Sequence, residues 1–556
     1  MKNHIVKNKF NSNNSDSLLD IINNFNYILN KFSSNNNINN KIECHLKDVL
    51  FSHISSDMNN KDYYEVKSIA NGCIYGYVAF SLKECKQLKK EKKDVILVAR
   101  NDKLYSINEL KLFDGLILLD GTFNSHVAIV ARSRNIPSVS ISNESLKKDI
   151  QKQLAKNVGR IKCCIDGTYG IITFQEVNIY QPKQQIFNEL KLWCQKAERV
   201  LLEYGSNPIK IMANADTPIE VSRALDYGAS GIGGCRIEHM FLTRKRLKIM
   251  QELLLFPSEK KEQNLYEQQK EIIRKDVKKM LQIVSPMPFS IRLMDALPSE
   301  FLPIDGEEIK FLLNERNMSI ENYNKLSEDI LKSDGMLGIR GCRYGLVNRD
   351  IYISQIEGIL RAAYDIMDEG KNIDISIVIP FIRETEELQI VINYINEVKD
   401  KLYSEYGEEI KVTIGTMIEI PRAMFIADKL AKICNLFIFG TNDLTQFLHA
   451  LSRNSENMLY HKCLQSRNPF YSIDVEGVGE FIMHALKKGK IYNNELVAGI
   501  CGEHVNDTDS LKFFKRTNVD FLSCISGNVL IIRVISLYQS IMDLLIENRI
   551  DLEKSI

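Results

Sequence analysis

The sequence lacks several features that would assign it to common classes of protein. Twelve cysteines are scattered over 556 residues without a C-x-x-C pair, which argues against a zinc site or a disulfide framework and favours a reducing compartment. The formal net charge is +1 and no long basic run occurs, so no nucleic-acid groove is predicted. The asparagine-rich N-terminus lacks the apolar core of a secretory signal, and no apolar run reaches the roughly 18 residues of a membrane span. We therefore expect a cytoplasmic protein without a nucleic-acid or membrane partner.

Composition divides the chain into four zones. Residues 1–61 are rich in Asn, Ser and Lys around two short apolar runs, which predicts a short helical pair in a poorly ordered polar segment. Residues 62–178 are expected to form a small β-rich α/β domain, and residues 179–206 a helical linker in which Trp193, the only tryptophan, packs between domains. Residues 207–556 form the last zone. The strand-like runs of the small domain are 73–80, 95–98, 115–119 and 170–174.

The last zone repeats one pattern eight times: a short apolar run that ends in a charged or reactive side chain. Amphipathic stretches long enough for crossover helices lie between these runs, for example 384–402 and 420–433. Such alternation predicts a closed (β/α)₈ TIM barrel, in which the carboxyl ends of all strands share one face. Side chains remote in sequence then converge on one pocket. The predicted strands are 209–214, 231–236, 289–295, 375–380, 412–419, 436–439, 496–501 and 521–524.

The most informative segment of this zone is G-T-N-D-L-T-Q at 440–446, directly after an apolar strand. Its Asn442 and Asp443 place an amide and a carboxylate at the mouth of a buried strand. Carboxylate oxygens are hard ligands of the kind that Mg²⁺ prefers, so the segment predicts a metal and phosphate site. The other strands that open on the same face end in or near Arg236, Arg292, Glu419 and Cys501.

A second reactive candidate lies in the small domain. His126 follows the strand 115–119 at the point where a turn opens a small apolar helix. The free backbone N–H groups of a helix start can hold a phosphoryl group, which suits an imidazole that accepts phosphate and passes it on. An ordinary helix-start histidine capped by Ser125 is the alternative interpretation.

The barrel residues have structural alternatives as well. Arg236 and Arg292 could be ion-pair partners, Glu419 could cap the next helix, and Cys501 could be one more buried thiol. Charged groups are also placed for structural reasons, so each residue taken alone leaves the choice open. Their joint placement at strand ends favours a functional site.

Seven motifs occur in a fixed order between residues 235 and 504, in addition to the histidine segment G-T-F-N-S-H-V-A-I-V-A-R at 121–132, within a match that is continuous from about residue 42 to the C-terminus. Together they resemble the phosphoenolpyruvate-utilising enzymes, most closely the pyruvate, phosphate dikinases, whose histidine segment reads G-G-x-T-S-H-A-A-x-x-A-R. The seven motifs are C-R-I-E-H-M-F (235–241), I-R-L with E-F-L-P (291–303), M-L-G-I-R-G-C-R (336–343), G-T-M-I-E-I-P-R-A (415–423), G-T-N-D-L-T-Q (440–446), S-R (452–453) and G-I-C-G-E-H (499–504).

This resemblance implies a phosphotransferase that interconverts phosphoenolpyruvate and pyruvate through a phosphohistidine. His126 would carry the phosphoryl group on a domain, 62–178, that swings about the linker to the barrel. Cys501 would protonate the enolate of pyruvate, which suits a thiol with a pKa near neutrality. Glu419 and Asp443 would hold Mg²⁺. The substrate would be bound by Arg236, Arg292, Arg340, Glu419, Gly440, Thr441, Asn442 and Asp443.

The chain also departs from the resembling family. Dikinases carry a large ATP-grasp module ahead of the histidine domain, and here at most sixty residues precede it, without a glycine-rich phosphate loop. We therefore expect ATP to be handled by a separate ATP-grasp chain or not at all. Thr122 and Asn124 replace a glycine and a threonine of the family beside the histidine. The resemblance further implies a homodimer.

Two alternatives remain open at this point. A sugar-transport phosphotransferase of the enzyme I type shares the barrel and the histidine domain, but it inserts a helical carrier-binding domain that is not visible between residues 62 and 126. The other alternative is a catalytically idle dikinase remnant, suggested by the missing ATP module and the substitutions beside His126.

Overall fold

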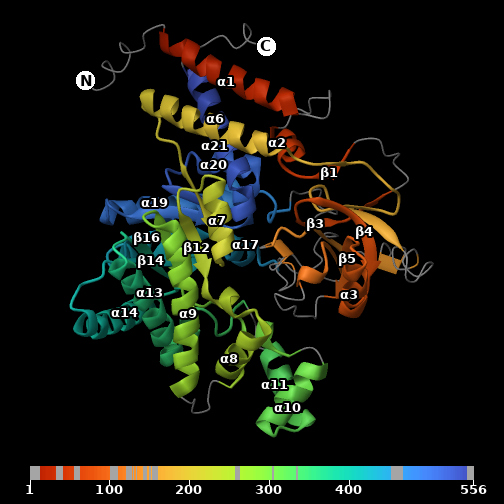
Figure 1. Cartoon of the computed structure of the whole chain (residues 1–556). Helices are drawn as coiled ribbons and strands as arrows, with labels where there is room; N and C mark the ends of the chain where they lie inside the picture. Colours follow the sequence, from red (N-terminus) through yellow and green to blue (C-terminus); the bar gives the residue numbers. More distant parts are fainter. Residues whose placement is uncertain are drawn as a thin grey trace.

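In a computed structural model, the chain has an α/β structure with a helical N-terminal part, a small sheet domain and a barrel (Figure 1). In that view the N-terminal helices lie at the top, the barrel below them and the sheet domain to the right. The structure describes residues 13–32, 42–55, 63–100, 110–119, 128, 131–132, 134–141, 147–148, 152, 161–256, 263–303, 306–332, 336–452 and 468–547.

Eight parallel strands close into a barrel in sequence order, and each overlaps one of the predicted strands. The ring is completed by β18, which pairs with β11 from Lys210–Phe521 to Asn214–Ile525. The predicted (β/α)₈ barrel is therefore confirmed, and all eight carboxyl ends share one face. The strands are β11 (Lys210–Asn214), β12 (Ile232–Arg236), β13 (Pro288–Arg292), β14 (Asp374–Ile379), β15 (Thr413–Ile418), β16 (Leu436–Gly440), β17 (Val497–Cys501) and β18 (Phe521–Ile525).

Helices lie around the barrel, and α14 (Thr385–Tyr406), for example, buries one apolar face that includes Leu388, Val391 and Ile395. This helix begins at a capping box and ends at Gly407, whose φ of 72° is left-handed. The other helices after the linker are α7 (Pro218–Asp226), α8 (Arg244–Leu255), α9 (Gln263–Val284), α10 (Gly306–Arg316), α11 (Ile320–Lys332), α12 (Cys342–Val347), α13 (Arg349–Asp368), α15 (Pro421–Phe425), α16 (Ala427–Leu430), α17 (Thr441–His449), α19 (Glu480–Tyr492), α20 (Thr508–Phe514) and α21 (Val529–Glu547). Of these, α10 and α11 pack in an apolar cluster of their own with Phe256 and Leu302.

The small domain is built on an eight-stranded mixed sheet of order β2-β9-β8-β4-β5-β6-β7-β3. Its central strands are apolar on both faces, since separate clusters around Leu116 and Ile117 pack on opposite sides. The four predicted runs correspond to β4, β5, β6 and β9, whereas β2, β3, β7 and β8 were not among them. The elements are β2 (Tyr64–Glu65), β3 (Lys67–Ala70), β4 (Cys73–Ala79), α3 (Leu82–Lys90), β5 (Val95–Arg100), β6 (Gly115–Leu119), β7 (Ser138–Ile141), β8 (Lys162–Asp166) and β9 (Ile171–Thr173).

The N-terminal part differs from its prediction. Instead of a short helical pair in a poorly ordered polar segment, α1 (Asn13–Phe32) is one continuous helix, followed by α2 (Ile42–Leu50). Phe25 is fully buried, and its ring lies 4.7 Å from that of Trp193 on the linker helix α6 (Gln184–Glu203). The Trp193 indole N–H donates to the carbonyl of Ile21 at 2.9 Å. The tryptophan thus joins α1 to the linker, as its predicted packing role requires.

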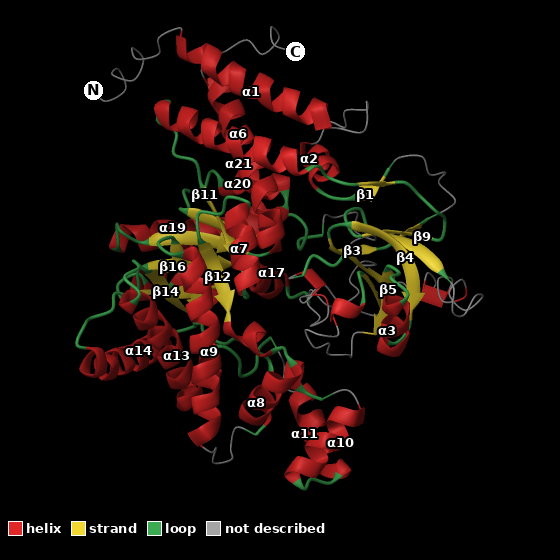
Figure 2. Cartoon of the chain, in the orientation of Figure 1, coloured by secondary structure: helices red, strands yellow, loops and turns green. Residues whose placement is uncertain are grey.

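The two connections of the small domain run side by side. The incoming segment forms β1 (His53–Ile54) and the outgoing segment forms β10 (Ile179–Tyr180), and these pair antiparallel. Both ends of the small domain therefore leave it at one place, next to the N-terminal helices (Figure 2).

Helix α21 corrects the expectation that no segment is apolar enough for a membrane span. Residues 526–547 pass that test by length and composition, but 61% of the most apolar window is buried inside the structure. Core helices commonly pass the same test, and α21 packs against α6.

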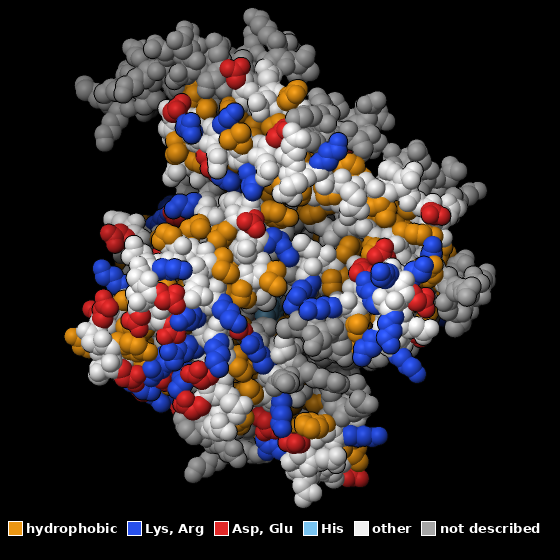
Figure 3. All heavy atoms as spheres, in the orientation of Figure 1, with side chains coloured by type: hydrophobic (Ala, Val, Ile, Leu, Met, Phe, Trp, Pro, Cys, Tyr) orange, Lys and Arg blue, Asp and Glu red, His pale blue; other side chains and the backbone are white. Residues whose placement is uncertain are grey.

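On the face shown in Figure 3, acidic and basic side chains are intermingled, in keeping with the net charge of +1.

Candidate active site

A cavity of about 190 Å³ lies where the carboxyl ends of the barrel strands meet. Arg340 stands outside its lining but bonds to a lining residue, and Thr441 is fully buried behind it. His126 lies outside the described residues, whereas Arg132, from the same predicted helix, borders the cavity. The structure therefore brings together every predicted barrel residue that it describes. The predicted residues in the lining are Arg236, Arg292, Glu419, Gly440, Asn442, Asp443 and Cys501.

Three carboxylates form the acidic centre of the site. One oxygen each from Asp295, Glu419 and Asp443 lies within 4.8 Å of the others. Glu419 is 2% exposed and accepts a hydrogen bond from the backbone N–H of Phe381 at 2.8 Å. Burial, and then the neighbouring Asp295 and Asp443, raise the pKa of Glu419 to about 8. Without a cation, the negative charge of this cluster keeps a proton on Glu419 at neutral pH. Three carboxylates placed so close together are a donor set that a hard divalent cation fits.

Arg340 is fixed between two of these carboxylates. Its Nε and Nη2 donate to Asp295 at 2.9 and 2.6 Å, and Nη2 also donates to Asp443 at 3.1 Å. The guanidinium carbon lies 4.7 Å from the centre of the Phe381 ring. Burial disfavours the cation, but Asp295 and Asp443 outweigh it and raise the pKa of Arg340. The side chain is therefore a permanent, oriented positive charge.

Arg292 provides a second oriented cation from the end of β13. It pairs with Glu238 and, at 3.4 Å, with Asp295. Burial opposes its charge, yet Glu238 and Asp295 raise the pKa of Arg292. Within the described part of the chain, Arg292 Nε and Glu238 Oε2 are buried without a hydrogen-bond partner. Unmatched polar atoms of this kind are costly, and a polar ligand in the cavity would remove part of that cost at Arg292.

Arg236, at the end of β12, is held by Asp216. The carboxylate accepts from Arg236 Nη2 at 2.6 Å, from its backbone N–H at 2.7 Å, and lies 2.7 Å from His239 Nδ1. Burial opposes ionisation of the carboxyl, but Arg236 and His239 lower the pKa of Asp216. The guanidinium is thus locked in place at the edge of the cavity.

The turn from β16 into α17 shapes the opposite side. A Cβ on Gly440 would lie 2.7 Å from Glu419 Oε2, so only glycine fits against this carboxylate. Thr441 Oγ1 donates to the carbonyl of Cys501 at 3.0 Å, and Asn442 Oδ1 accepts from the N–H of Glu503 at 3.0 Å. These bonds tie the strand ends of β16 and β17 together.

Cys501 borders the cavity but differs electronically from the prediction. Burial, and then Glu419, raise the pKa of Cys501 to about 12, whereas a value near neutrality was expected. The thiol is consequently protonated at neutral pH. It is suited to donating a proton, and less suited to removing one.

Several residues that organise the site were not predicted. Asp216 and Asp295 follow β11 and β13 by two and three residues, and Glu238 follows β12 by two. Their position just beyond barrel strands was the available signal. The main partner of each arginine could not be read from this position, because the pairs Asp216–Arg236 and Glu238–Arg292 join different strand ends and Arg340 lies in a loop.

Comparison with known proteins gives the family of this barrel and of the sheet domain. Residues 193–539 match the PEP-binding domain of the PEP-utilising enzymes, and residues 91–160 match the mobile domain of the same family. The chain belongs to the PEP-utilising enzymes. The resemblance seen in the sequence motifs is thereby confirmed.

The curated relatives of this PEP-utilising enzyme include several named pyruvate, phosphate dikinase. That of Rickettsia prowazekii (strain Madrid E) is 34% identical over 475 residues, covering 83% of this chain and 53% of the relative. Those of Rhizobium meliloti (strain 1021) and Entamoeba histolytica are 32% and 31% identical, each over 83% of this chain and 52% and 53% of the relative. The chain spans about half the length of these relatives. A solved citrate lyase from Burkholderia xenovorans LB400 covers 33% of this chain and 53% of its own, at 15% identity and a TM-score of 0.24, too low to indicate a common fold.

Proposed function

We propose that this chain transfers a phosphoryl group between phosphoenolpyruvate and His126, with pyruvate as the other product. The observation that carries the proposal is the convergence of three arginines, an acidic cluster and a protonated thiol on one barrel face. Residues 62–178 are assigned to the phosphohistidine domain, 179–206 to the linker and 207–556 to the barrel that binds phosphoenolpyruvate. Residues 1–61 are assigned to a polar N-terminal segment that is partly helical.

The docked position of the sheet domain supports this assignment. Arg132, which follows His126 in the sequence, borders the barrel cavity, and its carbonyl accepts from Arg223 Nη1 on α7 at 3.5 Å. A second contact joins Asn71 Nδ2 to Asn528 Oδ1 at 3.4 Å. Both of these hydrogen bonds are long, and we propose the paired β1 and β10 as the hinge of the domain. Such a domain can leave the barrel and return to it.

The proposed reaction breaks the bond between phosphorus and the enol oxygen and forms one between phosphorus and an imidazole nitrogen of His126. Arg236 and Arg292 neutralise the charge on the transferring phosphoryl group, with Arg340 behind them. Cys501 donates its proton to the methylene carbon of the enolate, which gives pyruvate. Gly440, Thr441 and Asn442 form the surface against which the substrate carboxylate lies.

Mg²⁺ is the proposed cofactor, held by Glu419 and Asp443. Its chemistry there would be charge neutralisation at the enolate and phosphoryl oxygens. The donor set fits because the cluster consists of carboxylates and raises the pKa of Glu419. Asp295 completes the acidic cluster, and we assign it to holding Arg340 rather than the metal.

Further proposals concern partners and location. ATP would be handled by a separate ATP-grasp chain or not at all, and the protein would form a cytoplasmic homodimer, as the resemblance implies. Adding ATP without such a chain should then leave His126 unphosphorylated. Sedimentation analysis would report the dimer directly.

The experiment for the central proposal is isotope exchange between labelled pyruvate and phosphoenolpyruvate with Mg²⁺ and without nucleotide. The parent protein should exchange label, and His126→Ala and Cys501→Ala should abolish it. His484→Ala and Cys434→Ala are matched controls, because His484 is exposed and Cys434 is buried outside the cavity. Absence of exchange in the parent protein would show an idle site, and transfer to a carrier protein would favour the enzyme I alternative.

A further inference from the structure

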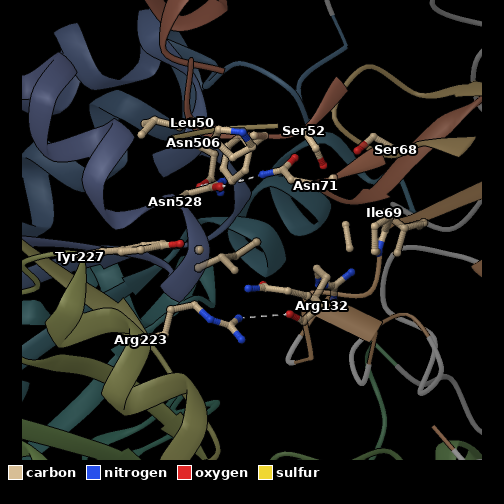
Figure 4. Close-up of a pocket in the computed structure, with 18 of the residues that line it drawn as sticks. Leu50, Ser52, Ser68, Ile69, Asn71, Arg132, Arg223, Tyr227, Asn506 and Asn528 are labelled. Carbon is tan, nitrogen blue, oxygen red and sulfur yellow. Dashed lines mark hydrogen bonds between the residues drawn. The ribbon is translucent and has the colours of Figure 1, made fainter. Parts of the chain in front are cut away.

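A second and larger cavity, of about 580 Å³, lies between the sheet domain and the barrel. Figure 4 shows that it is lined from one side by Ser68 and Asn71, on β3 and the turn after it, and from the other by Arg223 and Tyr227 of the α7 region. Its size is that of a pocket for a small organic molecule. No role in the proposed phosphoryl transfer accounts for it.

Two guanidinium groups supply positive charge to this cavity, those of Arg132 and Arg223. Arg223 points across the interface and donates to the Arg132 carbonyl (Figure 4). Burial lowers the pKa of Arg223, while Glu220 only partly opposes that shift. An anion beside Arg223 would therefore stabilise a cation that its surroundings disfavour.

Aromatic and amide groups line the rest of the cavity. The rings of Tyr227 and Phe187 are stacked, with centroids 5.7 Å apart and planes 20° apart. Three amides form a chain across the interface: Asn71 donates to Asn528 at 3.4 Å, and Asn528 donates to Asn506 at 2.9 Å. Rings hold flat apolar bodies, and amides can both donate to and accept from a polar ring edge. Phe51, Phe470 and Tyr471 add further aromatic surface.

Two carboxylates also border the cavity, on the barrel side. Asp507 Oδ2 accepts from Ser472 Oγ at 2.8 Å and from the Ser510 N–H at 2.8 Å, so it serves as a helix cap. Glu503 lies nearby. An anionic group would consequently sit toward Arg132 and Arg223, with the neutral part of the molecule toward the amides.

We propose that this interdomain cavity binds an aromatic phosphate ester of about the size of a nucleoside monophosphate. The phosphate lies between Arg132 and Arg223, and the ring lies against the aromatic and amide side chains. A ligand in this place contacts both the sheet domain and the barrel, so it holds the sheet domain in its docked position.

The cavity adjoins the candidate active site, because Arg132, Glu503, Asn506 and Ile525 border both. A bound ligand would thus slow the departure of the phosphohistidine domain from the barrel. This coupling rests on the proposed function, whereas binding itself does not.

Isothermal titration of the intact chain tests the binding. The probes are adenosine 5′-monophosphate, pyridoxine 5′-phosphate, phenyl phosphate, adenosine and inorganic phosphate. We expect saturable binding of at least one of the three aromatic esters, with adenosine and inorganic phosphate each at least about tenfold weaker than the best ester. A preference for the nucleotide or for the pyridoxine ester identifies the source of the ligand. Failure of all three esters to bind overturns the proposal.

Two variants locate the site. Arg223→Gln should weaken binding of the best ester at least about tenfold, whereas Arg199→Gln, at an exposed position on α6, should leave it unchanged. Asn528→Ala, which removes the central amide, should also weaken it. Binding that is unaffected by both cavity substitutions would place the ligand elsewhere and refute the proposal. Circular dichroism confirms that each variant is folded.

Phosphorylation of His126 by phosphoenolpyruvate is measured separately on the same preparations. If this phosphorylation is absent while the ester binds, the proposed function fails and the binding site stands. If His126 is phosphorylated but the aromatic esters do not bind, the reverse holds.

Discussion

Asp295 holds the guanidinium group of Arg340 with two hydrogen bonds, Oδ1 to Nε at 2.9 Å and Oδ2 to Nη2 at 2.6 Å. This pair joins the end of β13 to the segment before α12 and sets the charge that faces Asp443. The buried side chain of Asp295 also lies 3.4 Å from Arg292. One carboxylate therefore orients two of the arginines that we assign to phosphoryl transfer.

Asp295→Asn should lower the rate of pyruvate exchange by about 10- to 100-fold, because the isosteric amide removes the charge that fixes both arginines. Asp276→Asn is the matched control, since Asp276 pairs with Arg246 away from the cavity. The control should change stability but not exchange. Equal exchange rates in the parent and Asp295→Asn proteins would remove Asp295 from the site.

Glu419 should make the metal-free protein less stable as pH rises. Its folded-state pKa of about 8 lies above the unfolded value of about 4.3. The stabilising contribution of the protonated form is fully present below pH ~4.3 and is lost as pH rises through about 8, with a slope of at most about 1.4 kcal/mol per unit. Glu419→Gln should lack this slope in urea unfolding followed by Trp193 fluorescence between pH 5 and 9. Identical slopes for the two proteins would contradict the assignment, and saturating Mg²⁺ should flatten the slope of the parent.

Cys501 should give a steep pH dependence to proton removal from pyruvate. Only the thiolate can act as a base, and the pKa of about 12 means that its fraction rises with pH throughout the neutral range. Deuterium uptake at the pyruvate methyl group should increase about tenfold per unit between pH 7 and 9, and Cys501→Ala should lower it by about 10²- to 10⁴-fold. Cys434→Ala should behave like the parent. A rate that levels off near pH 7 would mean that the thiol has a near-neutral pKa.

Gly440→Ala should weaken Mg²⁺ binding and exchange without unfolding the chain. The added Cβ would lie 2.7 Å from Glu419 Oε2 and 3.0 Å from Glu419 Cβ, so the carboxylate must move. Gly306→Ala is the control, because a Cβ there meets nothing within 4 Å. Calorimetric titration with Mg²⁺ should separate the two variants, and equal affinities would show that this close approach is unimportant.

Phe25→Ala should destabilise the protein by about 3–5 kcal/mol, as expected for a fully buried phenylalanine. Asn24→Ala, at an exposed position of the same helix, should change stability by less than about 0.5 kcal/mol. Trp193 fluorescence reports both, because the Phe25 ring packs against the only tryptophan. A small effect of Phe25→Ala would show that α1 is dispensable for the fold.

The alternation of short apolar runs with amphipathic stretches was sufficient to predict the barrel. All eight predicted strands are present, because each is a short apolar run whose residues are buried on both faces, and the intervening helices bury one face. The short strands β2, β3 and β7 escaped prediction, since strands of two to four residues carry little pattern. The continuous helix α1 was missed because its polar composition masks the buried stripe around Phe25.

The order of apolar runs and the charged residues after them determined the barrel, the shared face and most of the residues that line its cavity. Only the tertiary structure decided that Asp295 and Asp216 hold the arginines, that Glu419 retains a proton to about pH 8, and that the Cys501 thiol has a raised pKa. It also decided the cavity between the sheet domain and the barrel. The physical reason is that strand and helix periodicity depends on near neighbours along the chain, whereas ion pairing and desolvation depend on groups that folding brings together from distant segments.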